Sequence, residues 1–211
     1  MRNMQPEEVH EAVTLVRGNP KPFFMMEGIG EGFDAAMFVG YHAMSGTENA
    51  ICDHTISSGT VDAVYVNGRE TGEFGINAAI AGWYGVPAVM LSGDEAACME
   101  ARDFVPKVRT AAVKTAVGRV SARCIHPKKA RKLIRDVALD ALTHLTEFEP
   151  HWVNEPVVIK AVWRTTTLAD IVSVLPYMER VSGKATQCEF DSFPLAYRGL
   201  RAAIAVASTI R

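Results

Sequence analysis

The sequence alternates short apolar runs rich in β-branched residues with amphipathic segments of helical length, and this alternation constrains the fold more than any other feature. Residues 86–93, VPAVMLSG, are typical of a buried strand, and residues 94–104, DEAACMEARDF, of a helix with an acidic N-terminus. Further strands are predicted at 33–42, 108–117, 156–163 and 184–190, and further helices at 74–85, 126–145, 167–175 and 191–210. Strands separated by helices predict a layered α/β fold, with a mixed sheet flanked by helices.

A first helix is predicted near the N-terminus, over residues 6–16. Pro6 and two glutamates suit the first turn of a helix, where a missing N–H and negative charge are both tolerated. Val9, Val13 and Val16 recur at helical spacing, so we expect one face of this helix to pack against the rest of the protein.

The predicted elements fall into two regions of unequal size. Residues 61–73, VDAVYVNGRETGE, predict a hairpin, because Asn67 and Gly68 supply the positive φ angles of a tight type I′ turn. This hairpin belongs to an α/β region over residues 1–150. Residues 151–211 form a strand-helix-strand-helix portion that predicts a smaller C-terminal α+β lobe, although no long Gly/Ser linker separates the two regions.

Composition excludes several classes of protein. The chain has 22 Lys and Arg against 24 Asp and Glu, a formal net charge of -2, and no basic patch, which argues against a nucleic-acid partner. No stretch approaches the roughly 20 apolar residues that cross a bilayer, and the N-terminus lacks the apolar core of a signal peptide. The four cysteines are scattered without a CxxC pair and are typical of reduced thiols. We therefore expect a cytoplasmic protein with no membrane partner.

Three residues stand out as candidates for chemistry. His42 ends a predicted strand, where ligands collect in α/β folds, and His54 directly follows Asp53. Glu73 lies between the hairpin and a helix, where the helix dipole alone explains a glutamate. Imidazole and carboxylate together are also how catalytic zinc is held, so a metal site and ordinary structural roles both remain open. The remaining histidines are expected to be exposed or capping: His10, His126, His144 and His151.

Several motifs carry a resemblance to a known family. They are KPFFMMEGIGEGFDAAMFVGYHAMSG at 21–46, DHTISSG at 53–59, VNGRETGEFGINAAIAGWYGVPAVMLSGD at 66–94 and TAAVKTAVGR at 110–119. In this order they are similar to the bacterial zinc D-aminopeptidases, the family of the D-aminopeptidase associated with dipeptide-transport operons. The resemblance runs through most of the chain and is strongest between residues 21 and 135.

The resemblance implies a function and a set of site residues. The family removes the N-terminal residue from short peptides, favours D-amino acids such as D-Ala, uses two zinc ions and assembles into a homo-oligomeric, decameric ring. By motif, His42 and Glu73 are expected to be zinc ligands and His54 the catalytic histidine. Asn77, in the GIN motif, is expected to contact substrate. The cofactor is then zinc and the partner a short peptide substrate.

One departure from the family pattern leaves an alternative open. Family members begin with a strand carrying an Asp-x-Glu-Gly motif, followed by a further histidine segment, and this chain starts downstream of both. About two of the expected metal ligands are then encoded, too few for a stable catalytic zinc site. Three explanations remain, and we expect the first: the chain is an incomplete form of a normal enzyme. In the second, it is a natural short form that is inactive or that binds metal only when another chain supplies ligands. In the third, it is a non-catalytic protein of ring assembly and metal binding.

Overall fold

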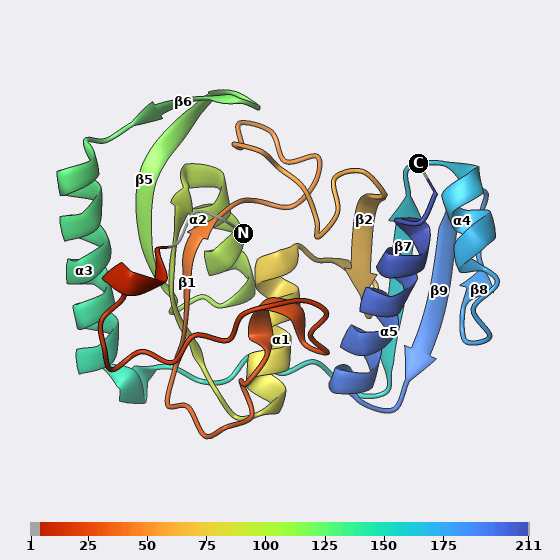
Figure 1. The fold of residues 1–211 in the computed structure, drawn as a ribbon, viewed down its shortest axis with the longest axis horizontal. Helices are drawn as coiled ribbons and strands as arrows, with labels where there is room; N and C mark the ends of the chain where they lie inside the picture. The colour runs from red at the N-terminus through yellow and green to blue at the C-terminus, as the bar shows by residue number, and fades with distance from the viewer. Residues whose placement is uncertain (1–4, 211) are drawn as a thin grey trace.

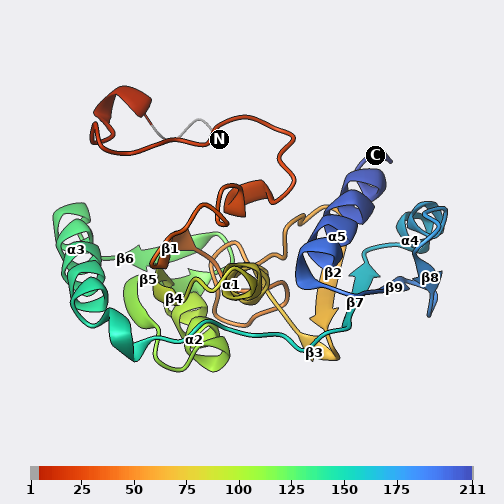
Figure 2. The same ribbon diagram turned by 90° about the horizontal axis from the view of Figure 1, so that it is seen from below.

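Two β-sheets with a helix between them organise residues 5–210, the part of the chain that the computed structural model describes (Figure 1). The helix is α1 (Glu73–Trp83), and its residues from Glu73 to Gly82 are all buried. A helix buried on every side needs apolar or small residues all round, which the sequence EFGINAAIAG supplies apart from Glu73 and Asn77. Figure 2 shows α1 end-on, with the first sheet on one side and the second sheet on the other.

The first sheet is the parallel part of the fold. Its strands, in spatial order, are β1 (Ala36–Tyr41), β4 (Ala88–Asp94), β5 (Arg109–Gly118) and β6 (Ser121–Cys124). β1, β4 and β5 are parallel, whereas β6 folds back antiparallel on β5. Helix α3 (Pro127–Thr143) packs against β4 and β5 through a separate apolar cluster, and α2 (Glu95–Phe104) packs with α1 in the main core. β4 is buried along its whole length because helices cover both of its faces.

The second sheet is antiparallel throughout. Its strands, in spatial order, are β3 (Arg69–Glu70), β2 (Val61–Val66), β7 (Val157–Trp163), β9 (Ala185–Phe190) and β8 (Glu179–Arg180). Alternate residues of β7 are buried, as expected of a sheet with one covered face. Helices α4 (Thr166–Val172) and α5 (Phe193–Ala207) pack against this sheet, and α5 also contacts α1.

The predicted α/β class with a mixed arrangement of strands is confirmed, and the hairpin lies where the sequence places it. Asn67 and Gly68 have φ angles of 47° and 83°, as the type I′ turn requires. The hairpin pairs with β7, so the second sheet takes β2 and β3 from residues 1–150. A boundary at residue 150 therefore divides the chain, but the second sheet contains strands from both sides of this boundary. The two-region organisation stays a prediction.

The predicted helix over residues 6–16 is wrong. Only a 3₁₀ turn, η1 (Pro6–Glu8), forms there, and Val13 and Val16 are each 51% exposed. A helix this short is marginal without a packed apolar face, and this segment lies apart from both sheets (Figure 2). Two further 3₁₀ turns are η2 (Phe24–Met26) and η3 (Leu145–Glu147).

Two other expectations concern the chain as a whole. All four cysteines are free thiols, and Cys98 and Cys188 are buried. Among residues 5–210, no helix is long and apolar enough to cross a membrane.

Candidate metal centre

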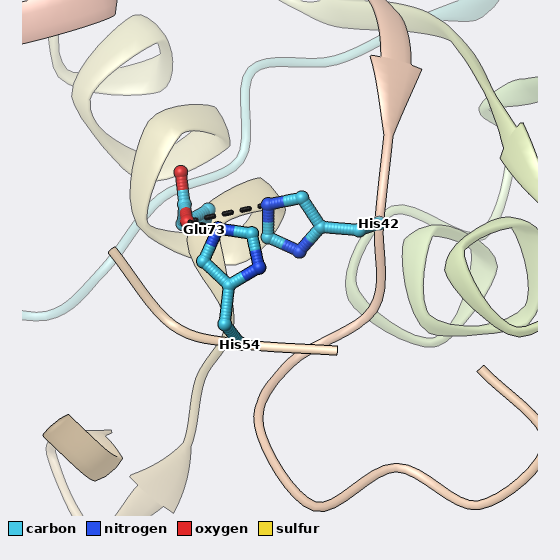
Figure 3. Close-up of side chains that lie close together, drawn as sticks. All are labelled: His42, His54 and Glu73. Carbon is cyan, nitrogen blue, oxygen red and sulfur yellow. Dashed lines mark ion pairs between the residues drawn. The ribbon is translucent and has the colours of Figure 1, made fainter. Parts of the chain in front are cut away.

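Three side chains predicted from the sequence converge where the two sheets approach each other (Figure 3). His42 directly follows β1, His54 lies in the loop between β1 and β2, and Glu73 is the first residue of α1. His42 Nε2 is 3.3 Å and His54 Nε2 3.5 Å from the same Glu73 oxygen, Oε1. The two imidazole rings stack with centroids 3.7 Å apart. Among the described residues this is the one group of at least three such side chains whose ligand atoms lie within 4.8 Å of one another.

Backbone carbonyls fix the tautomer of both histidines. His42 Nδ1 lies 3.0 Å from the Ala43 carbonyl oxygen, and His54 Nδ1 lies 2.6 Å from the Cys52 carbonyl oxygen. A carbonyl only accepts, so each Nδ1 is the donor, and in the neutral rings each Nε2 keeps its lone pair. Metal-binding histidines are held in this way, with the outer nitrogen bonded to a carbonyl and the inner nitrogen free for the ion.

Electrostatics couple the three groups before any ion arrives. Burial alone would raise the pKa of Glu73, but the hydrogen bond and charge of His42, the Ile56 N–H at 2.7 Å and the charge of His54 together lower it below its usual value. Burial alone would lower the pKa of His42, but its hydrogen bonds to Glu73 and Ala43 raise it. A carboxylate stabilised in its charged form beside two imidazoles is suited to a divalent cation.

The spacing also fits zinc. Bonds of about 2.1 Å to nitrogen and oxygen at tetrahedral angles place ligand atoms about 3.4 Å apart. The two nitrogen–oxygen distances of 3.3 and 3.5 Å match this spacing. His42, Glu73 and His54 therefore offer a donor set that zinc accepts, and His54, predicted as the catalytic residue, lies as close to Glu73 as a third ligand would.

Buried carboxylates hold the loop that carries the histidines. Asp94, the N-cap of α2, accepts the Ala97 N–H at 2.8 Å and also the Ile51 N–H at 2.6 Å. Glu100 on α2 accepts the Met44 N–H at 2.7 Å. These bonds tie the loop after β1 to a rigid helix, and this helix fixes the direction in which the loop leaves His42.

Glu100 is itself an unusual residue of the centre. Its side chain is 9% exposed, and Oε1 has no hydrogen-bond partner among the described residues. Burial raises the pKa of Glu100 to about 7, against the lowering effects of the Met44 N–H and the His42 charge. Glu73 and Asp94 raise it further by repulsion.

Asn77 lies on α1 behind the centre and is 2% exposed. Its amide donates to the Tyr41 hydroxyl at 2.9 Å and to Met25 Sδ at 3.1 Å, and its carbonyl accepts from the Tyr197 hydroxyl at 3.2 Å. The predicted contact with substrate would require one of these bonds to break. Asn77 also positions Tyr41, whose ring is nearly parallel to that of His42 with centroids 6.3 Å apart, and its contact with substrate stays a prediction.

The histidines predicted to be exposed or capping follow the prediction with one exception. His10 and His144 are exposed, and His126 accepts the Lys128 N–H at the start of α3. His151 is half-buried with its ring edge-on to Phe104, and burial lowers its pKa. His151 is half-buried because it packs against Phe104, the last residue of α2, a contact between segments distant in the sequence.

Sequence reasoning missed Asp94 and Glu100 as parts of the centre. Asp94 was recognised only as an acidic helix start, since nothing in its own segment points to Ile51. Glu100 carried a signal: it falls at helical spacing between Ala97 and Phe104, on the buried face of α2. A glutamate on an apolar helix face has to be paired, neutral or functional.

Comparisons with known proteins agree with this geometry. The family described as peptidase M55, D-aminopeptidase, matches residues 1–202. The D-aminopeptidase of Bacillus subtilis (strain 168) is 34% identical over 186 residues, which cover 88% of this chain and 67% of that protein.

A solved structure shares the fold. It is that of the zinc-dependent D-aminopeptidase DppA from Bacillus subtilis, described as a self-compartmentalizing protease. The two structures superpose with a TM-score of 0.94 at 32% sequence identity, over 99% of this chain and 76% of that chain. On the extent of these matches, the chain belongs to the peptidase M55 family of D-aminopeptidases.

Proposed function

We propose that this protein is a zinc-dependent aminopeptidase that releases the N-terminal residue of short peptides, with D-amino acids such as D-Ala as the preferred residue. The observation that carries the proposal is the convergence of two imidazoles and one carboxylate on spacings that suit zinc. The family to which the chain belongs, and the zinc dependence of the Bacillus subtilis relative, support the same activity.

We assign His42 and Glu73 as zinc ligands and His54 as the catalytic histidine. Bound zinc would polarise the scissile carbonyl and lower the pKa of a bound water. His54 is 29% exposed at its side chain and lines an open cavity of about 410 Å³, so substrate can reach it. Its Nε2 is free to take a proton from the attacking water or to donate one to the leaving amine, while Cys52 holds the ring in place.

The assembly and the compartment are further parts of the proposal. The Bacillus subtilis relative is described as self-compartmentalizing, which supports a homo-oligomer here, and we propose a ten-subunit ring that encloses the active sites. Large apolar side chains on the surface, such as Val120 at 82% and Trp152 at 64% exposure, are suited to contacts between subunits. We also propose a cytoplasmic location, which the four free cysteines support.

The test measures zinc content and hydrolysis together. We expect zinc-loaded protein to release D-alanine from D-alanyl-D-alanine, and His42→Ala or Glu73→Gln to lose both zinc and activity. We expect His54→Ala to keep its zinc while the rate falls about 10²- to 10⁴-fold, the usual contribution of a general acid or base. His144→Gln, an exposed histidine, serves as the control and should change neither.

Two results would change the assignment. Loss of zinc from His54→Ala, to the same degree as from Glu73→Gln, would make His54 a third ligand. A zinc-loaded wild type that hydrolyses no aminoacyl peptide would refute the enzymatic function and favour a non-catalytic assembly and metal-binding protein.

A further inference from the structure

The open cavity beside His54 is lined by charged side chains that the proposed chemistry does not use. Its volume is about 410 Å³, and its lining includes Arg119 and Arg164 together with Asp53 and Asp62. A cavity of this size accommodates a small ligand of a few residues. His54 belongs both to this cavity and to the candidate metal centre, so a molecule bound at the centre lies next to the cavity that the two arginines line.

Arg119 is fixed next to His54 by its side chain and its backbone. Its Nε donates to Asp53 Oδ1 at 2.7 Å, its Nη2 donates to the Asp53 carbonyl at 2.8 Å, and its own carbonyl accepts the Cys52 N–H at 2.8 Å. Within residues 5–210, no acceptor is bonded to Nη1, and the side chain is 56% exposed. One edge of the guanidinium is therefore held by the protein and the other is available to a ligand.

Arg164 lines the same cavity and is also only partly bonded to the protein. Its Nη1 donates to the Ser58 carbonyl at 2.8 Å, and its Nε lies 3.8 Å from Asp62. Its Nη2 has no acceptor in the described part of the chain. Two arginines and two aspartates therefore line this cavity, and Lys184, outside the cavity, also pairs with Asp62 at 3.0 Å. The donors Nη1 of Arg119 and Nη2 of Arg164 stay without a protein acceptor among the described residues.

We propose that Arg119 and Arg164 bind the C-terminal carboxylate of the peptide substrate, an inference that rests on the proposed function. Guanidinium groups pair with carboxylates through two parallel N–H···O bonds, a geometry that amides and esters do not match. An extended residue spans about 3.5 Å, so a carboxylate one or two residues beyond the scissile bond stays within a cavity of this size. The enzyme would then select di- and tripeptides with a free C-terminus, and the arginines bind substrate without taking part in the chemistry.

The experiment compares D-alanyl-D-alanine with its C-terminal amide, which removes the negative charge and keeps the shape. We expect wild type to favour the free acid by about tenfold or more in kcat/KM, the effect of a charge-assisted hydrogen bond at a partly exposed site. Arg164→Gln and Arg119→Gln should lose most of this preference, because kcat/KM on the free acid falls toward the value on the amide. Arg164→Lys should keep part of the preference for the free acid, because the positive charge remains but the two parallel N–H donors of the guanidinium are lost.

Arg135→Gln, an exposed arginine on α3, is the matched control and should keep the preference of wild type. Arg119→Gln could also disturb the loop through Asp53, so its zinc content is compared with that of wild type. Arg164 contacts the loop that carries His54 through the Ser58 and Thr60 carbonyls and not through Asp53, and the zinc content of Arg164→Gln is measured in the same way. Saturation-transfer NMR on chelated protein measures binding of the same two ligands without turnover.

The outcomes separate this inference from the proposed function. Equal kcat/KM on acid and amide, or a preference that survives in both arginine variants, overturns the inference and leaves the aminopeptidase function intact. No hydrolysis of either ligand, combined with NMR binding that favours the acid and is lost in Arg164→Gln, overturns the function and keeps the carboxylate site. No hydrolysis and equal binding overturn both.

Discussion

Replacing Glu100 by glutamine should make the metal-free protein more stable, and increasingly so as the pH rises. Glu100 Oε2 accepts the Met44 N–H, a bond that a glutamine carbonyl can keep, whereas Oε1 is buried without a partner. The carboxyl is 9% exposed, so solvent screens it little. Glutamine has nearly the same shape but cannot ionise, which isolates the cost of the charge.

The magnitude follows from the pKa of Glu100, raised from 4.5 to about 7 by burial. The folded protein binds this proton more tightly than the unfolded chain, so the carboxyl does not destabilise the fold below pH 4.5. Stability is lost as the pH rises from there through 7, and the loss levels off above it. The full loss is about 3 kcal/mol, and about 2.5 kcal/mol of it falls between pH 5 and pH 8.

The assay is urea unfolding of wild type and Glu100→Gln, both treated with chelator, at pH 5 and pH 8. His42 and Glu73 titrate in both proteins, so the difference between variant and wild type reports residue 100 together with its charge coupling to His42 and Glu73. We expect the advantage of the variant to grow by about 2 to 3 kcal/mol between the two pH values. Glu189→Gln, an exposed glutamate on β9, is the control and should show no such growth.

A constant difference between the two proteins across this pH range would refute the reasoning, because it would mean that Glu100 titrates alike in the folded and unfolded chains. Zinc provides a second check. A cation bound at His42 and Glu73 would stabilise the ionised Glu100, so adding zinc at pH 8 should shrink the advantage of the variant.

Two further predictions concern the same centre. Gly72→Ala should destabilise the protein by about 1 to 3 kcal/mol, because the added Cβ would lie 2.2 Å from Glu100 Oε1 and 2.8 Å from Met44 Cβ. Thermal unfolding measures this loss. Gly59→Ala is the control and should cost far less in that assay, because an added Cβ there meets no atom within 4 Å. Zinc affinity should fall as the pH drops through the raised pKa of His42, since protons compete for Nε2 at a higher pH than for an ordinary histidine. A competition titration with a chromophoric chelator measures the affinity at each pH. An affinity that stays constant down to pH 5 would contradict the prediction.

Local patterns were enough to predict most elements of the fold. The strand at β4, the turn at Asn67 and the N-cap at Asp94 are each encoded within about ten residues of sequence. The failure at residues 6–16 has the opposite cause. Val13 and Val16 have helical spacing but no surface to pack against, and spacing alone does not stabilise a short helix.

The candidate centre was predictable in its residues but not in its support. The motifs around His42, His54 and Glu73 identified the three side chains, and the structure brings them together. The bonds from Asp94 to Ile51 and from Glu100 to Met44 join residues more than 40 positions apart. No periodicity within one segment encodes such a pairing, so tertiary structure was needed to find it.

The place of the hairpin in the second sheet has a consequence for zinc affinity. His54 precedes β2 and Glu73 follows β3, so the β2–β3 hairpin connects the two residues. In the sheet, β2 also pairs with β7. His42 follows β1 in the first sheet, so opening the hairpin from β7 would displace Glu73 from the other zinc ligand that we assign. Binding of zinc and pairing of β2 with β7 are then thermodynamically linked, and a substitution in β7 or β9 that loosens this pairing weakens metal binding from a distance. Zinc occupancy thus reports on the integrity of a sheet that contributes no ligand.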